Sequence, residues 1–439
     1  LADAGNCVCV VEHDEEIIKS ADKIFEIGPR PGVNGGRITF TGSVAQIKKA
    51  KKSITGKWLS RCQIKDFFKN TKSISKKSKL QLKIKSASKH NINNLSCSFP
   101  IEGLTCIAGI SGSGKSTLAY NIIYNGLRNQ IDDLGNSVIS EKEFEDIVLI
   151  DQSSVVRSPR SNPVLYTDAW NPIKEAFSRL DAAKKLGFSS SDFSFNSGYG
   201  RCETCSGLGY EIVEMQFLSD IQVPCKTCNG KRFKEELLSV KLDGLNITEI
   251  LNLNIEDALG RFEHFPGTFR KLNLLKSVGL GYLQLGQPLN TLSGGESQRL
   301  KLIKFMSALK LKSKPSLLII DEPTTGLHLE DVDQLMKTLN KIAENGHSLL
   351  VIEHHKHVLA QADWICEMGP GAGKLGGKII SSCTPSQLIK LNTPTADILK
   401  SKSISKSGPI KREVSQIRDQ GNLTITGARE NNLKNIFTK

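Results

Sequence analysis

The sequence has 439 residues, of which 38% are hydrophobic and 24% charged, as expected of a globular protein with about two to three domains. Lys and Arg number 59 against 45 Asp and Glu, and this excess suits a polyanionic partner. Apolar runs of four or five residues are far shorter than the ~18 residues of a membrane span. With no signal-peptide pattern, we expect a cytoplasmic protein without a membrane partner.

The beginning of the chain recurs later in the sequence. In VEHDEEIIKSADKIFEIGP, residues 11–29, an apolar run ends at Glu-His and a helix-like stretch leads to Gly-Pro. The whole segment 5–38 aligns without a gap on 346–379, so that equivalent residues differ by 341 in number. Residues 82–95 align on 423–436 with the same offset. Because chance seldom gives two matches with one offset, we expect a piece of a longer tandem protein.

The segment 48–89 contains fifteen Lys or Arg and a single opposing acid, Asp66. A second Lys- and Ser-rich stretch lies around 400–412. Such composition favours a solvated, partly flexible connector, with a DNA-facing linker as the alternative.

Residues 103–123 predict a strand, a glycine loop and a helix. The pattern G-x-x-x-x-G-K-S places backbone amides around phosphate oxygens, a lysine on the β- and γ-phosphates of ATP, and a serine hydroxyl on Mg²⁺. The predicted nucleotide-binding residues of this loop are Gly109, Ser111, Gly112, Gly114, Lys115, Ser116 and Thr117.

Four cysteines in 201–233 have the spacing of a structural zinc site. Each of two pairs is separated by two residues, and nineteen residues lie between the pairs. Four thiolates complete the tetrahedral coordination of Zn²⁺ and leave no open position for catalysis, and two disulfides are the less favoured alternative. The predicted ligands are Cys202, Cys205, Cys225 and Cys228.

The zinc module would present a group of basic residues. For this group, phosphate contacts and simple solvation are equally compatible with the sequence. Its members are Arg201, Lys226, Lys231, Arg232 and Lys234.

A buried strand is predicted at LLII, residues 317–320, with two carboxylates at its end. Asp321 would hold Mg²⁺, through water, and Glu322 would orient and polarise the attacking water. Upstream, Ser293, Gly294 and Gly295 would open a helix whose free amides suit a phosphate.

The order of these motifs resembles that of ABC ATPases. In that family the Ser-Gly-Gly motif completes the ATP site of a partner across a dimer interface. The resemblance implies that His354 is the γ-phosphate switch and Gln152 the loop glutamine that couples nucleotide state to an inserted domain. By the repeat, His13 would be the same switch of a preceding ATPase unit.

Longer stretches resemble one family, the UvrA subunit of the bacterial excision-repair nuclease. They are GISGSGKST, DQSSVVRSPRSNP, CETCSGLG, CKTCNGKR, VGLGYLQLGQPLNTLSGGESQRLKL, IIDEPTTGLHLEDV, ADWICEMGP and GARENNLKNI. Two departures are Val156, where glycine is usual, and His355, where asparagine is usual.

The resemblance implies an α/β fold of ABC-type P-loop ATPase domains with a zinc-binding, DNA-facing insertion. It implies a homodimer that binds damaged double-stranded DNA and loads a partner, UvrB, under control of ATP, Mg²⁺ and Zn²⁺, without cutting DNA itself. Another cytosolic ABC ATPase, of a transport or drug-resistance type, is the alternative.

The implied organisation has five parts. They are the end of a first ATPase domain (1–60), a basic linker (61–79), a second ATPase domain (80–397) with a signature and zinc insertion (153–290, zinc module about 200–233), a linker (398–420), and the first strand of a further unit (421–439). The last part suggests a duplicated or longer UvrA.

Overall fold

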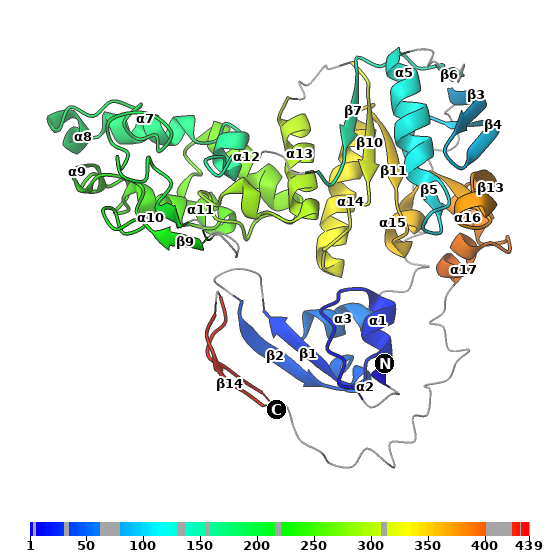
Figure 1. The fold of residues 1–439 in the computed structure, drawn as a ribbon, viewed down its shortest axis with the longest axis horizontal. Coiled ribbons are helices and arrows are strands. Elements are labelled where there is room, and N and C mark those ends of the chain that lie inside the picture. The colour runs from blue at the N-terminus through cyan, green and yellow to red at the C-terminus, as the bar shows by residue number, and fades with distance from the viewer. Residues whose placement is uncertain are drawn as a thin grey trace. The chain divides into compact units, whose positions relative to one another are not determined.

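The computed structural model describes residues 1–2, 6–29, 35–61, 80–129, 137–153, 158–213, 215, 221–308, 314–400, 424–430 and 432–438. The chain forms two compact units, one made of Leu1–Asp151 with Lys312–Lys439 and the other of Gln152–Leu311 (Figure 1). The predicted linkers 61–79 and 398–420 fall almost wholly outside the described residues, and so does Val156.

A six-stranded sheet forms the centre of the first unit, in the order β13-β12-β5-β11-β10-β7. Its strands are β5 (Gly103–Gly109), β7 (Asp146–Ile150), β10 (Ser316–Asp321), β11 (Ser348–Ile352), β12 (Trp364–Gly369) and β13 (Lys378–Cys383). All neighbours are parallel except β12 and β13. The parallel strands β5, β10 and β11 are buried almost throughout, which explains their continuous apolar sequence.

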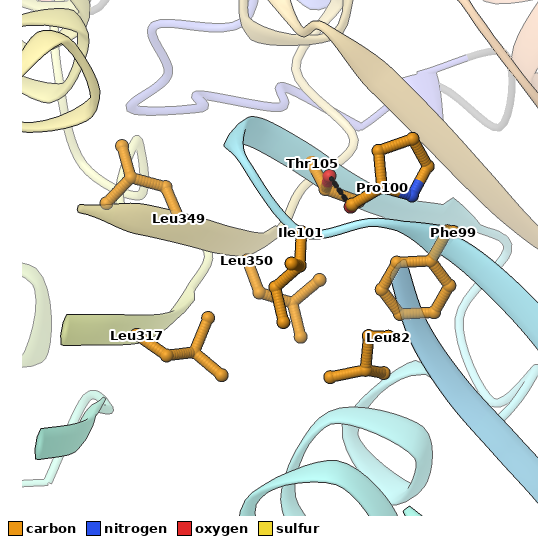
Figure 2. A pocket seen from close by; sticks show the side chains of 8 residues that line it. All are labelled: Leu82, Phe99, Pro100, Ile101, Thr105, Leu317, Leu349 and Leu350. Atoms are coloured by element: carbon orange, nitrogen blue, oxygen red, sulfur yellow. Dashed lines mark hydrogen bonds between the residues drawn. The ribbon is translucent and has the colours of Figure 1, made fainter. Parts of the chain in front are cut away.

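A smaller antiparallel sheet of β4-β3-β6 packs beside the main sheet. Its strands are β3 (Gln81–Lys89), β4 (Ile92–Pro100) and β6 (Ser137–Ser140). Figure 2 shows Leu82 and Phe99 of this sheet facing Leu317 and Leu350 of the main sheet across a small apolar cavity. The cavity lies in the core between the two sheets, and no charged residue lines it.

Helices cover the main sheet. The helix predicted after the glycine loop is η4 (Thr117–Tyr124), a π-helix that continues as α5 (Asn125–Asn129). The other helices of the complete ATPase unit are α14 (Leu329–Glu344), α15 (Lys356–Gln361), η6 (Gly373–Leu375), α16 (Pro385–Leu388) and α17 (Pro394–Lys400). Leu118, Ile122 and Ile123 of η4 are buried in the core.

The sequence repeat is also a structural repeat. The beginning of the chain forms α1 (Glu15–Ser20), β1 (Ile24–Gly28), β2 (Arg37–Gly42), α2 (Val44–Ile47) and α3 (Ile54–Arg61). The hairpin β1–β2 has a register irregularity after Glu26, and β12–β13 has one after the equivalent Glu367. Near the other end, β14 (Ile425–Ala428) pairs with β15 (Ile436–Thr438) in the register of β3 and β4.

One expectation for residues 11–29 needs correction. The helix-like stretch is not helical up to Gly28-Pro29, because α1 ends at Ser20 and the strand β1 follows. The apolar run before Glu12 is no strand, and Val11 is 99% exposed. Its counterpart β11 is a strand because β5 and β10 flank it.

The second unit is mainly helical. Its helices are α6 (Pro163–Tyr166), α7 (Asn171–Arg179), α8 (Asp181–Lys185), α9 (Glu235–Leu238), α10 (Ile247–Leu251), α11 (Ile255–Arg261), α12 (Pro266–Ser277), η5 (Leu289–Thr291) and α13 (Gly294–Ala308). One hairpin, β8 (Tyr210–Val213) with β9 (Ile221–Pro224), projects from the cysteine cluster. Within the described ranges, no helix of either unit is long and apolar enough to cross a membrane.

The Gly-Gly turn before β13 makes a contact that we expect to be sensitive to mutation. Gly377 has φ of 76°, and a Cβ atom there would lie 2.0 Å from the carbonyl oxygen of Asn91. Gly377→Ala should lower the free energy of unfolding by about 1–3 kcal/mol, measured by denaturant titration. Gly346→Ala is the matched control, because Gly346 has φ of 89° with no atom within 4 Å of its Cβ position. Equal losses of unfolding free energy in both variants would contradict the importance of this contact.

Candidate nucleotide and metal sites

The glycine loop after β5 is held from behind by the loop of residues 371–377. A Cβ atom on Gly109, which has φ of 130°, would lie 2.2 Å from the carbonyl oxygen of Met368. The amide of Gly373 donates to the carbonyl of Gly112 over 3.0 Å. The Asn91 side chain donates to Gly112 and Gly373 carbonyls at 3.3 and 3.2 Å. Only glycine permits such close backbone packing, which explains the repeated Gly-Pro…Gly-Gly sequence.

Lys115 lies at the beginning of η4 and folds over the loop. Its ammonium donates to the carbonyl oxygens of Gly109 at 3.0 Å and Ile110 at 2.9 Å. Burial lowers the pKa of Lys115, whereas the charges of Glu322 and Asp321 oppose that change. The lysine therefore lies near enough to the two predicted carboxylates for their charges to act on it.

The two carboxylates lie where β10 ends. Asp321 pairs in register with Ile352 of β11, and the amide of Glu322 donates to the carbonyl of Ile352 over 2.9 Å. Glu322 has φ of 46°, a left-handed conformation that is rare for a residue with a side chain and is typical of functional positions. Its Oε1 is 3.7 Å from Nδ1 of His354, so the structure brings these two predicted residues together.

Glu353 is a residue that sequence reasoning missed, and it orients the backbone before and after His354. Its buried carboxylate accepts hydrogen bonds from the amides of His354 at 2.8 Å, His355 at 2.9 Å and Thr324 at 3.1 Å. Glu12 accepts from the amide of His13 at 3.1 Å in the same way. The repeat of Glu-His in the sequence was the signal that could have indicated this role.

Tyr120 is a second residue that sequence reasoning missed. Burial raises the pKa of its phenol, and interaction with Asp321 and the charges of Asp151 and Glu322 raises it further. Tyr120 therefore stays protonated and lies close enough to Asp321 for that carboxylate to act on it. No motif distinguishes this residue, since its position is set by η4.

Gln152 and the Ser-Gly-Gly motif belong to the second unit. The Oγ of Ser293 accepts from the amide of Glu296 at 3.3 Å, and the carboxylate of Glu296 accepts from the amide of Ser293 at 2.7 Å. This reciprocal pair is a capping box that fixes the beginning of α13. A Cβ atom on Gly294 would lie 3.2 Å from the carbonyl oxygen of Gln152. The structure thus brings Gln152 beside the motif, although the roles of all these residues stay predictions.

The four predicted zinc ligands converge in one buried cluster. All four Sγ atoms lie within 4.8 Å of one another, and two of the distances are 3.6 and 4.0 Å. A tetrahedral ion with bonds of about 2.3 Å to sulfur requires separations of roughly 3.8 Å. A disulfide requires about 2.0 Å, so these cysteines are free thiols arranged as for a metal ion.

Each cysteine pair is shaped by a turn with left-handed backbone. Ser206 and Gly207 follow the first pair with φ of 49° and 82°, and Asn229 and Gly230 follow the second with 48° and 81°. Burial and the neighbouring Cys205 raise the pKa of Cys228 to about 12. A cation is therefore needed to hold Cys228 deprotonated, and the four residues fit Zn²⁺.

Only part of the predicted basic group faces solvent. Lys226 and Lys231 are exposed, but the guanidinium of Arg232 stacks over Phe195 at 5.6 Å. Lys234 pairs with Glu203 at 2.6 Å and lies 3.5 Å above the ring of Tyr199. Lys231 Nζ also lies 3.8 Å from Glu235, so that aromatic contacts and ion pairs engage three of the five predicted charges.

Comparison with known proteins identifies the relatives of this chain. No family model matches it. Over 394 residues the chain is 43% identical to "UvrABC system protein A" of Clostridium perfringens, covering 88% of this chain and 41% of that protein. It is 44% identical over 398 residues to the protein of that name from Pseudomonas putida, covering 89% and 42%. The chain therefore spans less than half the length of these relatives.

A solved structure, that of UvrA2 from Deinococcus radiodurans, superposes with a TM-score of 0.80 at 35% sequence identity. The match covers 89% of this chain and 47% of that one. The fold is therefore an α/β fold of ABC-type P-loop ATPases whose insertion carries a four-cysteine site, as the sequence predicts.

The metal site yields a direct prediction. The purified chain should contain about one zinc ion, and Cys225→Ser should lose it, because three thiolates leave the tetrahedral site open. Metal content by mass spectrometry and the far-ultraviolet circular dichroism of the chain are the measurements. Cys9→Ser, which changes an exposed cysteine outside the cluster, should keep the zinc. Equal zinc content in both variants would refute the assignment.

Proposed function

Because this chain belongs to the UvrA family, we propose that it is part of a DNA-repair ATPase whose nucleotide cycle controls binding to damaged duplex DNA and the loading of UvrB. The geometry that carries this proposal is the convergence of Lys115, the carboxylates after β10 and His354 in the first unit. Partner proteins, rather than this chain, would make the incisions.

The amides of the glycine loop and the ammonium of Lys115 would hold the phosphates of ATP. Ser116 and Asp321 would hold Mg²⁺, which neutralises developing charge on the phosphates when bound. The proximity of Asp321 to Tyr120 supports this role, since a protonated phenol can steady that carboxylate.

Glu322 would accept a hydrogen bond from the attacking water and polarise it. His354, 3.7 Å from Glu322, would sense the γ-phosphate, and Glu353 keeps its backbone in place. Gln152 would couple the nucleotide state to the inserted domain. The amides of Ser293–Gly295, at the beginning of α13, would complete the ATP site of a partner across the interface of a UvrA homodimer.

The zinc module would bind the DNA backbone. Lys226 and Lys231 lie exposed beside the cysteine turns, and lysines in such positions give salt-dependent affinity with little base recognition. The site of four sulfurs would hold the turns in place without taking part in hydrolysis.

Hydrolysis tests the nucleotide site. Glu322→Gln should lower the ATPase rate by a factor of about 10² or more, because the amide cannot polarise water as the carboxylate does, while ATP affinity stays within about threefold. Rates of phosphate release and titration with a fluorescent ATP analogue are the measurements. A Glu322→Gln rate equal to that of the unaltered chain would contradict the mechanism.

Lys115→Ala is the companion variant and should weaken ATP binding itself, because it removes the cation that faces the phosphates. Lys378→Ala, which removes an exposed lysine on β13, is the matched control and should bind ATP normally.

DNA binding gives an independent test. Exchanging both Lys226 and Lys231 for Glu should weaken binding to a damaged duplex and reduce the slope of log affinity against log salt by about 2. Fluorescence anisotropy at several salt concentrations measures this, with Lys390→Glu as the control. An unchanged slope would show that these two lysines do not contact the DNA.

A further inference from the structure

Two equivalent helices of the repeat meet in the first unit. Helix α1 (Glu15–Ser20) and helix α15 (Lys356–Gln361) have bounds that differ by the repeat offset of 341 residues. The carboxylate of Glu15 forms an ion pair with the ammonium of Lys356. Residues at equivalent positions of the two repeats therefore contact each other directly.

The neighbouring contacts follow the same symmetry. Glu16 Oε1 is 3.6 Å from Lys356 Nζ, and Glu15 Oε2 is 4.0 Å from His357 Nε2. Since Glu16 is equivalent to His357, each of these contacts is the image of the other under the repeat. In a two-fold contact, residues on the axis meet their own counterparts and off-axis contacts occur in reciprocal pairs. A local two-fold axis thus passes between Glu15 and Lys356.

The contact is buried rather than a chance surface pair. The side chains of Glu15, Lys356 and His357 are 9%, 12% and 1% exposed. Trp58 of α3 packs edge-on against His357, with 4.5 Å between ring centroids. Burial acts to raise the pKa of Glu15, but hydrogen bonds from His357, Lys19 and Lys356 overcome it and hold the pKa well below its ordinary value. Glu15 is therefore ionised within this interface, and Lys356 balances its negative charge.

The two sides of the axis carry opposite charge although they are repeats of one another. Residues 14–16 are Asp-Glu-Glu, and residues 355–357 are His-Lys-His, in which Lys356 carries the positive charge because burial lowers the pKa of both histidines. Two copies of the first sequence would bury Glu15 against an identical glutamate, and two copies of the second would bury Lys356 against an identical lysine. Like charges without compensation are strongly unfavourable in a buried contact.

We propose that residues 14–16 and 355–357 form a charge code that makes the end of one ATPase unit dock on the next unit of the same chain, in preference to a second copy of either unit. Glu15, Glu16 and Trp58 of this chain then occupy the contact face of α15. This inference goes beyond the repair function proposed above and needs only that the two repeats are units of one kind.

The same contact makes Glu15 a positioning residue for the switch of the complete unit. Lys356 follows His354 by two residues, and Glu353 fixes the amides between them. A displacement of α1 would thus reach His354 through a short, hydrogen-bonded segment. His354 in turn lies 3.7 Å from Glu322.

A charge-swap cycle in the full chain tests the proposal. Lys356→Glu and Glu15→Lys should each release α3, so that its amides exchange with deuterium faster by a factor of roughly a hundred, the population change expected on breaking a buried ion pair. The double variant Glu15→Lys with Lys356→Glu should restore protection, because it re-forms the pair in reverse. Hydrogen exchange read by mass spectrometry is the measurement.

The controls separate this outcome from unfolding and from self-association. Exchange of β5 must stay unchanged in every variant, Lys356→Gln supplies a milder change if the reversal unfolds the chain, and Lys341→Glu reverses an exposed lysine on α14. Protection of α3 that is unaltered by both single reversals, or unrestored in the double variant, would overturn the charge code. Protection that rises with protein concentration would identify a second copy as the occupant and overturn docking within the chain.

Discussion

The parallel pairing of β5, β11 and β10 is the constraint on which the nucleotide site depends. Their registers place Ile107, Ile352 and Asp321 at one edge, so that the glycine loop, the segment beginning at Glu353 and the carboxylates after β10 emerge side by side. Carboxyl ends of parallel strands always meet in this way, which is why open α/β sheets bind ligands there. Lys115, Glu322 and His354 gain their geometry from a sheet that none of them belongs to.

A second set of contacts supports the loops at that edge. The loop 371–377 contacts the glycine loop through backbone atoms, and Asn91 ties the two loops together. Glu353 supports His354 in a similar way, because its carboxylate accepts a hydrogen bond from the amide of His354.

The two copies of the repeat share one backbone pattern but differ in the charges of their helices. Backbone registers of β1–β2 and β12–β13 coincide, whereas the helices α1 and α15 differ in the charges that they present at their first turns. Backbone geometry is set by glycines, alternation and the strand bulge, which tolerate surface change. Charge at an interface is free to diverge once two units are joined in one chain, because each then has a single partner.

The sequence by itself determined the fold class, the repeat offset and the cysteine cluster, because each rests on local spacing: glycines around a phosphate loop, buried apolar runs, and paired Cys-x-x-Cys. Only the tertiary structure decided that residues 6–11 form no strand while 348–352 do, since a strand needs neighbours for its backbone hydrogen bonds. It alone assigned Tyr120, Asn91 and Glu15, because their partners lie far away in sequence and no short motif encodes such contacts.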